Sequence, residues 1–336
     1  MKGSGNSEFG KVVIEDDRDV LIEDIKTSRV LAELNAIMKT RSVPPAVTAY
    51  ADIQAVRSVS RSAMGAPDLE TVFLAGVAKE KDFGTDVHSA LLNADILRMG
   101  SSLEPTLKNI CAVHSEFLRG EAERPKKLGP TSISLPKAIM DGLAHLLEDQ
   151  DKDGLLRALG AYLLFEMNRP FGENGLISLI VFHMFLHNFG LLENCSLCLL
   201  PDDASIEENQ KMISEIKNGG STKKWFLFML AHVYDAALDV LQKEFSVETS
   251  AEGLKDIYQD MPFYSDQLMA VLYSDLFIKG TDLISAGIAE RVTAMKYLTA
   301  MEDLGILQST KIGRERIFKN VELSKILLGN RSKTQM

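Results

Sequence analysis

The sequence is poor in cysteine. Its 336 residues include three cysteines, Cys111, Cys195 and Cys198, which are too few for a disulfide framework. Cys195 and Cys198 form a C-x₂-C pair, but no second pair and no nearby histidine cluster completes a zinc site. We therefore expect inert thiols and no bound metal.

Long apolar runs are also missing. No run reaches the roughly 18 consecutive apolar residues that a membrane-spanning helix needs, because His183 and His187 interrupt the run that follows Gly175. The first ten residues, MKGSGNSEFG, are polar and lack the apolar segment of a secretory leader. These absences predict a cytoplasmic protein without membrane contact. The two histidines share a helix face, but no third ligand stands at a metal-site spacing, so we expect them to be structural.

A general excess of positive charge is the third absence. The chain has 37 Lys and Arg against 47 Asp and Glu, a net charge of −10. This balance argues against a protein that coats nucleic acid over its whole surface. Residues 262–336 nevertheless hold 10 Lys and Arg against 8 Asp and Glu, a net charge of +2, and the rest of the chain carries −12. This asymmetry predicts a separate C-terminal domain.

Helical periodicity dominates the sequence up to about residue 260. Leu31, Leu34, Ile37 and Met38, for example, form one apolar stripe of a helix. Turn and cap residues separate the helices, among them Asp68, an expected N-cap. The predicted helices cover roughly 46–64, 86–99, 103–118, 155–167, 175–188 and 222–244, with Pro136 in the first turn of one more helix and Ser205 capping another.

The C-terminal region has a different order of elements. We expect helices at 266–277, 281–286 and 289–305, then two extended runs within 306–320 joined by a polar, glycine-containing turn. A helix-turn-helix followed by a basic hairpin is the winged-helix pattern.

Five residues of this pattern are candidates for DNA binding. Arg291, Thr293 and Lys296 would lie near the exposed start of the second helix, and Arg314 and Arg316 at the tip of the hairpin. Such residues can contact phosphates and base edges. Winged helices also serve as dimerisation or docking modules, and the low net charge leaves both interpretations open.

A short loop separates two strongly apolar helices in the middle of the sequence. It reads RPFGENG, residues 169–175, and contains turn or cap residues at Pro170, Gly172, Asn174 and Gly175. A loop at the start of a helix can hold an anion, because free N–H groups and the helix dipole point toward it. Composition alone favours an ordinary helix–loop–helix corner and leaves a phosphate cradle open.

The stretch FEMNRPFGENGLISL around this loop resembles the signature of the Fic family, H-P-F-x-[DE]-G-N-G-R-x-x-R. Other stretches are similar in the same order along most of residues 20–330. Residues 55–65 resemble the region of the family's inhibitory helix, HSEFLRGEAERP resembles the stretch before the target-docking flap, and AERVTAMKYLTAMEDLGIL resembles the winged helix that often follows.

This resemblance implies a mostly α fold, a Fic-type helical bundle with a C-terminal winged helix-turn-helix domain. It divides the chain into an N-terminal arm (1–20), a Fic-like helical domain (21–250) and a winged-helix domain (262–330). The family commonly transfers AMP from ATP to a hydroxyl group of a target protein.

Several chemical groups of the family are replaced in this sequence. Arg169 stands at the position of the histidine that acts as general base, and arginine stays protonated, so it cannot take a proton. Leu176 and Leu179 stand at the two phosphate-binding arginines. One loop residue is also missing. The remnant of the nucleotide-binding loop comprises Phe171, Gly172, Glu173, Asn174 and Gly175, with Glu173 at the acidic, metal-binding position.

The inhibitory and docking elements are altered as well. The inhibitory motif corresponds to Ser60, Met64 and Gly65, with Met64 where the family has a glutamate that pairs with the second arginine. Because Leu179 replaces that arginine, an apolar Met64 avoids leaving a charge unpaired. Between Arg119 and residue 133 there is too little room for the usual docking hairpin.

We therefore interpret the chain as a catalytically degenerate Fic-domain protein with no catalytic residue at the position of Arg169. Its function would be regulatory, through a protein partner, through self-association as a homodimer, or through DNA binding by the winged helix. The alternative is a Fic-type protein adenylyltransferase with residual or altered activity. ATP and magnesium would be needed only under that alternative, and no cofactor is required under the first interpretation.

Overall fold

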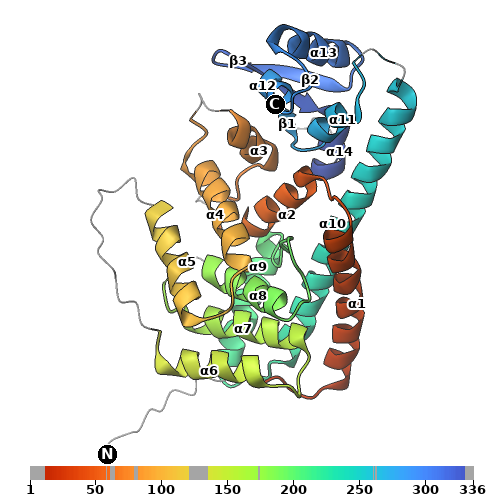
Figure 1. Cartoon of the computed structure of the whole chain (residues 1–336). Helices are drawn as coiled ribbons and strands as arrows, with labels where there is room; N and C mark the ends of the chain where they lie inside the picture. The colour runs from red at the N-terminus through yellow and green to blue at the C-terminus, as the bar shows by residue number, and fades with distance from the viewer. Residues whose placement is uncertain are drawn as a thin grey trace, which may run out of the picture.

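The computed structural model describes residues 12–57, 59–60, 65–78, 82–120, 135–172, 175–259, 261 and 263–329. Most of these residues are helical (Figure 1). The first part of the chain forms α1 (Arg18–Thr40), α2 (Pro45–Arg57), α3 (Leu69–Val77), α4 (Thr85–Ser101), α5 (Leu107–Gly120), α6 (Lys137–Glu148), α7 (Gly154–Asn168), α8 (Leu176–Asn188), α9 (Asp203–Lys217) and α10 (Lys223–Tyr258). The second part forms α11 (Asp266–Leu272), β1 (Phe277–Ile278), α12 (Gly280–Ser285), α13 (Arg291–Asp303), β2 (Leu307–Ile312), β3 (Glu315–Asn320) and α14 (Val321–Leu328).

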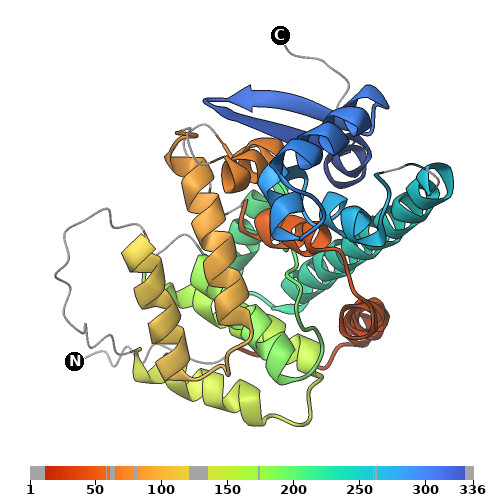
Figure 2. The same ribbon diagram turned by 45° about the horizontal axis from the view of Figure 1, so that its top comes forward.

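Helix α8 lies at the centre of the helical part. All its residues from Leu176 to Leu186 are buried, as expected for a helix that is apolar on every side. Helices α7, α4 and α5 pack against it, and α1 packs along α10 on the flank of the bundle (Figures 1 and 2). Phe165 of α7 and Phe182 and Phe185 of α8 are among the largest fully buried side chains. The predicted loop between α7 and α8 therefore projects from the best-packed part of the core.

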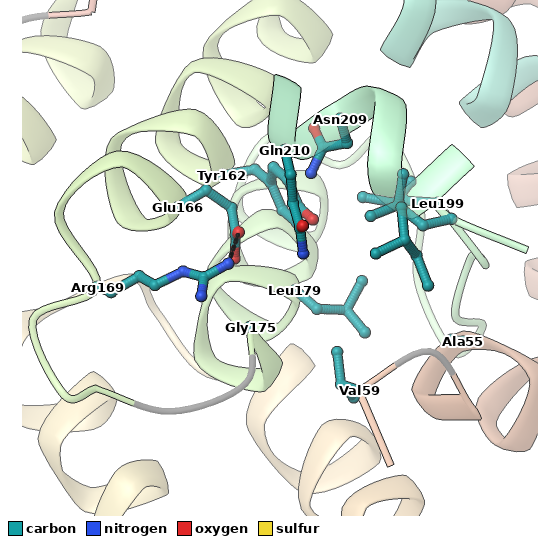
Figure 3. Close-up of a pocket in the computed structure, with 12 residues that line it drawn as sticks. Ala55, Val59, Tyr162, Glu166, Arg169, Gly175, Leu179, Leu199, Asn209 and Gln210 are labelled. Atoms are coloured by element: carbon teal, nitrogen blue, oxygen red, sulfur yellow. Dashed lines mark hydrogen bonds and ion pairs between the residues drawn. The ribbon is translucent and has the colours of Figure 1, made fainter. Parts of the chain in front are cut away.

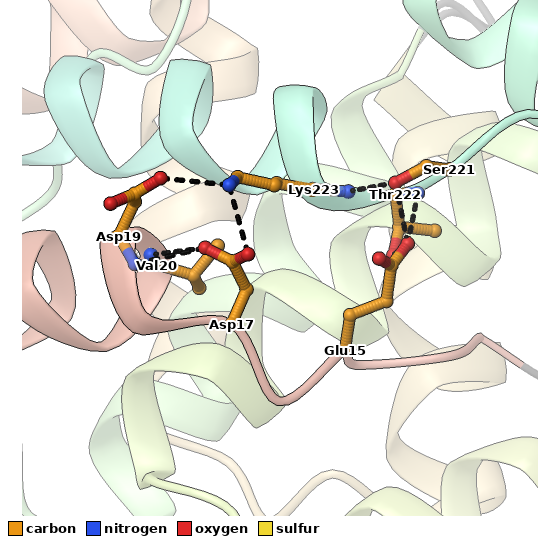
Figure 4. Close-up of polar contacts among 7 residues, drawn as sticks. All are labelled: Glu15, Asp17, Asp19, Val20, Ser221, Thr222 and Lys223. Carbon is orange, nitrogen blue, oxygen red and sulfur yellow. Dashed lines mark hydrogen bonds and ion pairs between the residues drawn. The ribbon is translucent and has the colours of Figure 1, made fainter.

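The segment before α1 is fastened to the start of α10 (Figure 4). Glu15 Oε1 accepts a hydrogen bond from the Thr222 backbone N–H at 2.9 Å, and Lys223 Nζ lies 2.8 Å from Asp17 Oδ2. Asp17 also caps α1 by accepting from the backbone N–H of Asp19. The helix begins at Arg18, slightly before the end of the arm that we placed at residues 1–20.

The C-terminal part is a winged helix, as the sequence predicts. Its three strands form an antiparallel sheet in the order β1-β3-β2, with Ser309 opposite Phe318. Two residues, Gly313 and Arg314, connect β2 to β3. Helices α12 and α13 pack together and α13 contacts β2. These elements confirm the predicted fold class, a mostly α chain with a small C-terminal sheet.

The winged helix is docked on the helical part by side chains of its sheet. Lys319 Nζ on β3 lies 2.9 Å from Glu70 Oε1 on α3. Lys279 Nζ donates to the backbone oxygen of Val77 at the end of α3 at 2.9 Å, and α14 packs against α10. Two of the positive side chains of the C-terminal region therefore bind groups of the helical part of the same chain.

Several helix boundaries differ from those predicted. Helix α10 continues to Tyr258 instead of ending near residue 244, α2 ends at Arg57 instead of near 64, and α5 begins at Leu107 instead of 103. The N-cap of α9 is Asp202, whereas Ser205 lies inside the first turn, where its hydroxyl completes a capping box. The helix predicted at 266–277 ends at Leu272 and is followed by β1, and α14 was not predicted.

The predicted N-cap at Asp68 is confirmed, since its side chain accepts from the backbone N–H of Thr71 at 3.0 Å. Among the described residues, none of the helices has the length and apolar character needed to cross a membrane.

Candidate functional site

The turn between α7 and α8 brings the ends of two core helices together. Helix α7 ends at Arg169, whose backbone has φ 39° and ψ 60°, the left-handed conformation common at helix C-termini. Helix α8 begins after Gly175, which has φ 95°. A Cβ atom on Gly175 would lie 3.0 Å from Glu166 Oε1, and the positive φ of this residue favours glycine in any case. The turn is thus shaped around the Glu166 side chain.

Glu166 is the partner of Arg169. It lies one turn earlier on α7, at the i, i+3 spacing that lets side chains meet, and Arg169 Nη2 is 3.3 Å from Glu166 Oε2. Glu166 is buried, with 4% of its surface exposed, and its Oε1 has no hydrogen-bond partner within the described part of the chain. Figure 3 shows the two side chains directed toward each other at the rim of a cavity. The i, i+3 spacing of Glu166 and Arg169 is the one signal in the sequence that points to this pair.

The cavity behind this pair is small. Its volume is about 50 Å³, and its wall combines polar and apolar side chains (Figure 3). Pockets that bury small organic ligands usually measure on the order of 300–1,000 Å³. Leu179, which the sequence resemblance aligns with the family's second arginine, lines the cavity and is buried, and Leu176 is fully buried. The described residues therefore leave room for a few water molecules and do not fit a nucleotide.

Phe171 links the turn to α5. Its ring stacks on the imidazole of His114 with 4.2 Å between centroids and 17° between planes. Burial lowers the pKa of His114 below its ordinary value. This stacking places Phe171 against the bundle, whereas Gly172 is exposed. Two more residues of the predicted remnant loop, Glu173 and Asn174, lie outside the described residues.

His183 holds α8 against the segment that follows it. Its Nδ1 lies 2.9 Å from the Leu179 backbone oxygen, and its Nε2 accepts from the Leu197 N–H at 2.9 Å. Since the Leu179 oxygen can only accept, Nδ1 carries the proton of the neutral ring. Complete burial lowers the pKa of His183 to about 4. The ring is fully engaged in structural contacts and has no lone pair left for a metal.

The thiols of the C-x₂-C pair are kept protonated by their surroundings. Burial raises the pKa of Cys198 to about 12 and also raises that of Cys195. Throughout the described ranges, no group of three or more His, Cys, Asp and Glu side chains is arranged to hold a metal ion.

Two of the three predicted inhibitory-motif positions are described by the structure, and the residue before the first of them lines the cavity. Ser60 is buried and its Oγ accepts from Asn93 Nδ2 at 2.9 Å, and Val59 lines the cavity wall. Gly65 has φ 102°, a conformation that favours glycine. Met64 lies outside the described residues, so its predicted contact with Leu179 stays a prediction.

The candidate DNA-binding residues come from α13, the β2–β3 turn and β3. Arg291 and Lys296 are exposed on α13, Thr293 is half-buried there, and Arg314 is exposed in the β2–β3 turn. Arg316 lies on β3 and forms an ion pair with Glu302 of α13. Its guanidinium also covers the ring of Phe318, with 5.0 Å between the guanidinium carbon and the ring centroid.

Two comparisons with known proteins agree with this architecture. Residues 250–323 match the family model described as the C-terminal domain of protein adenylyltransferases of the SoFic-like type. The whole fold is similar to the crystal structure of a Fic family protein from Desulfovibrio desulfuricans G20, with a TM-score of 0.51 and 14% sequence identity. That similarity covers 92% of this chain and 97% of the other. The chain therefore has the fold of a Fic family protein with a SoFic-like C-terminal domain, as the sequence resemblance predicted.

Proposed function

We propose that this chain is a catalytically degenerate Fic-fold protein with a regulatory function. The observation that carries the proposal is the Arg169–Glu166 pair at the position of the family's general base. A guanidinium stays protonated at every accessible pH, so it cannot take a proton from an attacking hydroxyl group.

The surroundings of the pair support the same conclusion. Leu176 and Leu179 occupy the positions of the phosphate-binding arginines and are buried, and the cavity of about 50 Å³ is far smaller than a nucleotide site. A phosphate placed there would lose its water and gain no cation from either leucine, although charge stabilisation is usually the largest contribution to such a reaction.

Labelled ATP with Mg²⁺ tests this proposal. We expect no transfer of label to the chain or to proteins of a cell extract, while a Fic protein with a complete motif serves as the positive control. Robust labelling that is lost in the Asn174→Ala variant would favour the adenylyltransferase alternative. A ligand at 100 times its Kd stabilises a protein by about 2.7 kcal/mol and so raises its Tm. Since we expect no nucleotide to bind, millimolar ATP or ADP should leave the Tm unchanged.

Protein contacts are the form of regulation that the surface favours. Leu21, Ile22 and Ile25 of α1 are 45%, 51% and 55% exposed and form an apolar stripe. Contiguous exposed apolar side chains are typical of interaction surfaces. If the contact is with a second copy, light scattering will give the mass of a homodimer, and the Ile22→Ser/Ile25→Ser variant will be a monomer.

DNA binding by the winged helix is the second candidate. The exposed Arg291 and Lys296 on α13 favour it, while the ion pair of Arg316 with Glu302 opposes it. A gel shift that weakens steeply with salt and is lost in Arg291→Ala/Lys296→Ala would support DNA binding. Lys211→Ala, which removes an exposed charge from α9, is the matched control.

A further inference from the structure

A second and larger hollow lies away from the turn between α7 and α8. It measures about 470 Å³, within the usual range for sites of small organic ligands. Its walls come from α2, from the segment 196–202 and from the middle of α10. It shares no lining residue with the cavity behind Arg169. We call it the α2–α10 groove, and its chemistry does not depend on whether the chain transfers AMP.

One face of α10 supplies most of its polar groups. His232, Asp235 and Asp239 follow one another at spacings of three and four residues and so lie on the same side of the helix. Asp202, the N-cap of α9, also lines the groove, although its Oδ1 already accepts from the Ser205 backbone N–H at 2.8 Å. Tyr50 of α2 completes this set of side chains.

These groups offer hydrogen-bond acceptors to a ligand. His232 Nδ1 lies 2.9 Å from the Phe228 backbone oxygen, so in the neutral ring Nδ1 carries the proton and Nε2 keeps a lone pair. Asp235 is exposed and makes no hydrogen bond or ion pair with another residue of the described part. The Tyr50 hydroxyl donates its proton to Asp239 Oδ2 at 2.9 Å. The three α10 side chains therefore favour a ligand that donates hydrogen bonds.

A lysine of α10 that lies outside the lining of the groove already pairs with two of its lining residues. Lys243 Nζ, one turn beyond Asp239 on α10, lies 3.6 Å from Asp239 Oδ1 and 5.4 Å from the centre of the Tyr50 ring. A carboxylate and an aromatic face are the usual surroundings of a bound ammonium group. The same kind of group can extend from Asp239 toward Asp235, where the carboxylate is not paired.

We propose that the α2–α10 groove binds a small organic cation, whose ammonium or guanidinium group donates hydrogen bonds to Asp235 and to Nε2 of His232. A divalent metal ion fits less well, because the described residues do not bring three metal-ligating side chains together at this place. The volume of the groove accommodates an organic molecule with its alkyl chain against Ala51 and Ala236.

Calorimetry of the full chain with agmatine, which carries both cationic groups, tests the proposal. We expect binding of one agmatine per chain, and the Asp235→Asn variant should bind about tenfold or more weakly, since it loses a charge-assisted contact. Glu252→Gln removes the same charge from an exposed position farther along α10 and should leave the affinity unchanged. Equal weakening in both variants would mean diffuse attraction, and would overturn the proposal.

A second titrant distinguishes a free amine from an arginine side chain of another protein. N-acetyl-arginine amide carries the same guanidinium on a peptide unit. Tighter binding of agmatine supports a free small cation as ligand, and tighter binding of the peptide unit supports a side chain. If neither binds, or if Asp235→Asn binds both as well as the unaltered chain, the groove is not a cation site.

Discussion

The cavity behind Arg169 and the α2–α10 groove use neighbouring parts of the chain but differ in size and chemistry. Both draw on α2 and on the segment 196–202. The cavity behind Arg169 measures about 50 Å³ and is walled by Leu179, Leu199 and Leu200, whereas the α2–α10 groove measures about 470 Å³ and exposes carboxylates. One hollow has become part of the core, and the other has kept open polar groups.

The fate of charge differs in the same way. At the first hollow, the buried Glu166 is neutralised by Arg169 from the same helix. At the second, Asp235 makes no ion pair with the described residues. Asp239 accepts a hydrogen bond from the Tyr50 hydroxyl and forms an ion pair with Lys243. A buried charge with an internal partner is compensated within the fold, whereas an exposed charge without one is available to a ligand from solution.

Leu179→Ala tests whether the first hollow is part of the core, and it should have the largest effect. Deleting buried methyl groups from a packed site costs about 2–5 kcal/mol of the free energy of unfolding. Asp235→Asn in the groove should change it by about 0.5 kcal/mol or less, because that side chain is exposed. Urea unfolding of both variants measures the two losses of unfolding free energy. Similar losses would contradict the prediction.

Acid should weaken the contact between α8 and the segment after it through His183. The pKa of this side chain is lowered to about 4 in the folded chain and is about 6.5 when unfolded. Between these values the unfolded state binds more protons, so stability is present above pH 6.5 and is lost as the pH falls toward 4. The loss attributable to His183 is about 3 kcal/mol.

The His183→Gln variant isolates this contribution. Urea unfolding of the unaltered chain and of the variant at several pH values between 7 and 4 gives each protein's free energy of unfolding as a function of pH. The carboxylates common to both proteins contribute equally to the two curves. We expect a shallower curve for the variant. Two parallel curves would mean that His183 does not control the acid response.

The sequence predicted α7 and α8 within a residue or so, because local signals mark their ends. Gly154 opens α7, and Gly175 precedes α8. It failed at the end of α10, where polar residues after 244 resemble a helix end. The helix continues because tertiary contacts hold it, among them the 2.7 Å hydrogen bond between the hydroxyl groups of Ser250 and Tyr273. Such contacts override local propensity.

The two hollows could be predicted only in part. The turn at 169–175 was found, because a contiguous motif marks it, but the burial of Glu166 cannot be read from its spacing to Arg169 alone. The groove joins Tyr50 to residues of α10 that lie far along the chain, and no local pattern connects them. A site assembled across the fold gives no signal in a single sequence.

Arg169→Ala should destabilise the fold by a smaller amount. It leaves Glu166 buried without its cation, but Arg169 itself is about half exposed, which limits the loss to about 1–2 kcal/mol. Adding Glu166→Gln should recover part of this loss, because the buried charge is then gone. Urea unfolding of the two single variants and the double variant measures the coupling. Additive losses would show that the pair does not interact.

Tyr50→Phe separates stability from binding in the groove and should destabilise the fold less than Leu179→Ala or Arg169→Ala. It removes one hydrogen bond to Asp239 while the ring and the Lys243 contact remain, so about 1 kcal/mol of unfolding free energy is lost. Asp239 then has a free oxygen that can accept from a cation. The affinity for agmatine should therefore hold or increase although the fold is weaker. A fall in both would mean that the hydroxyl group shapes the groove, and that its carboxylates belong to the core in the same way as Glu166.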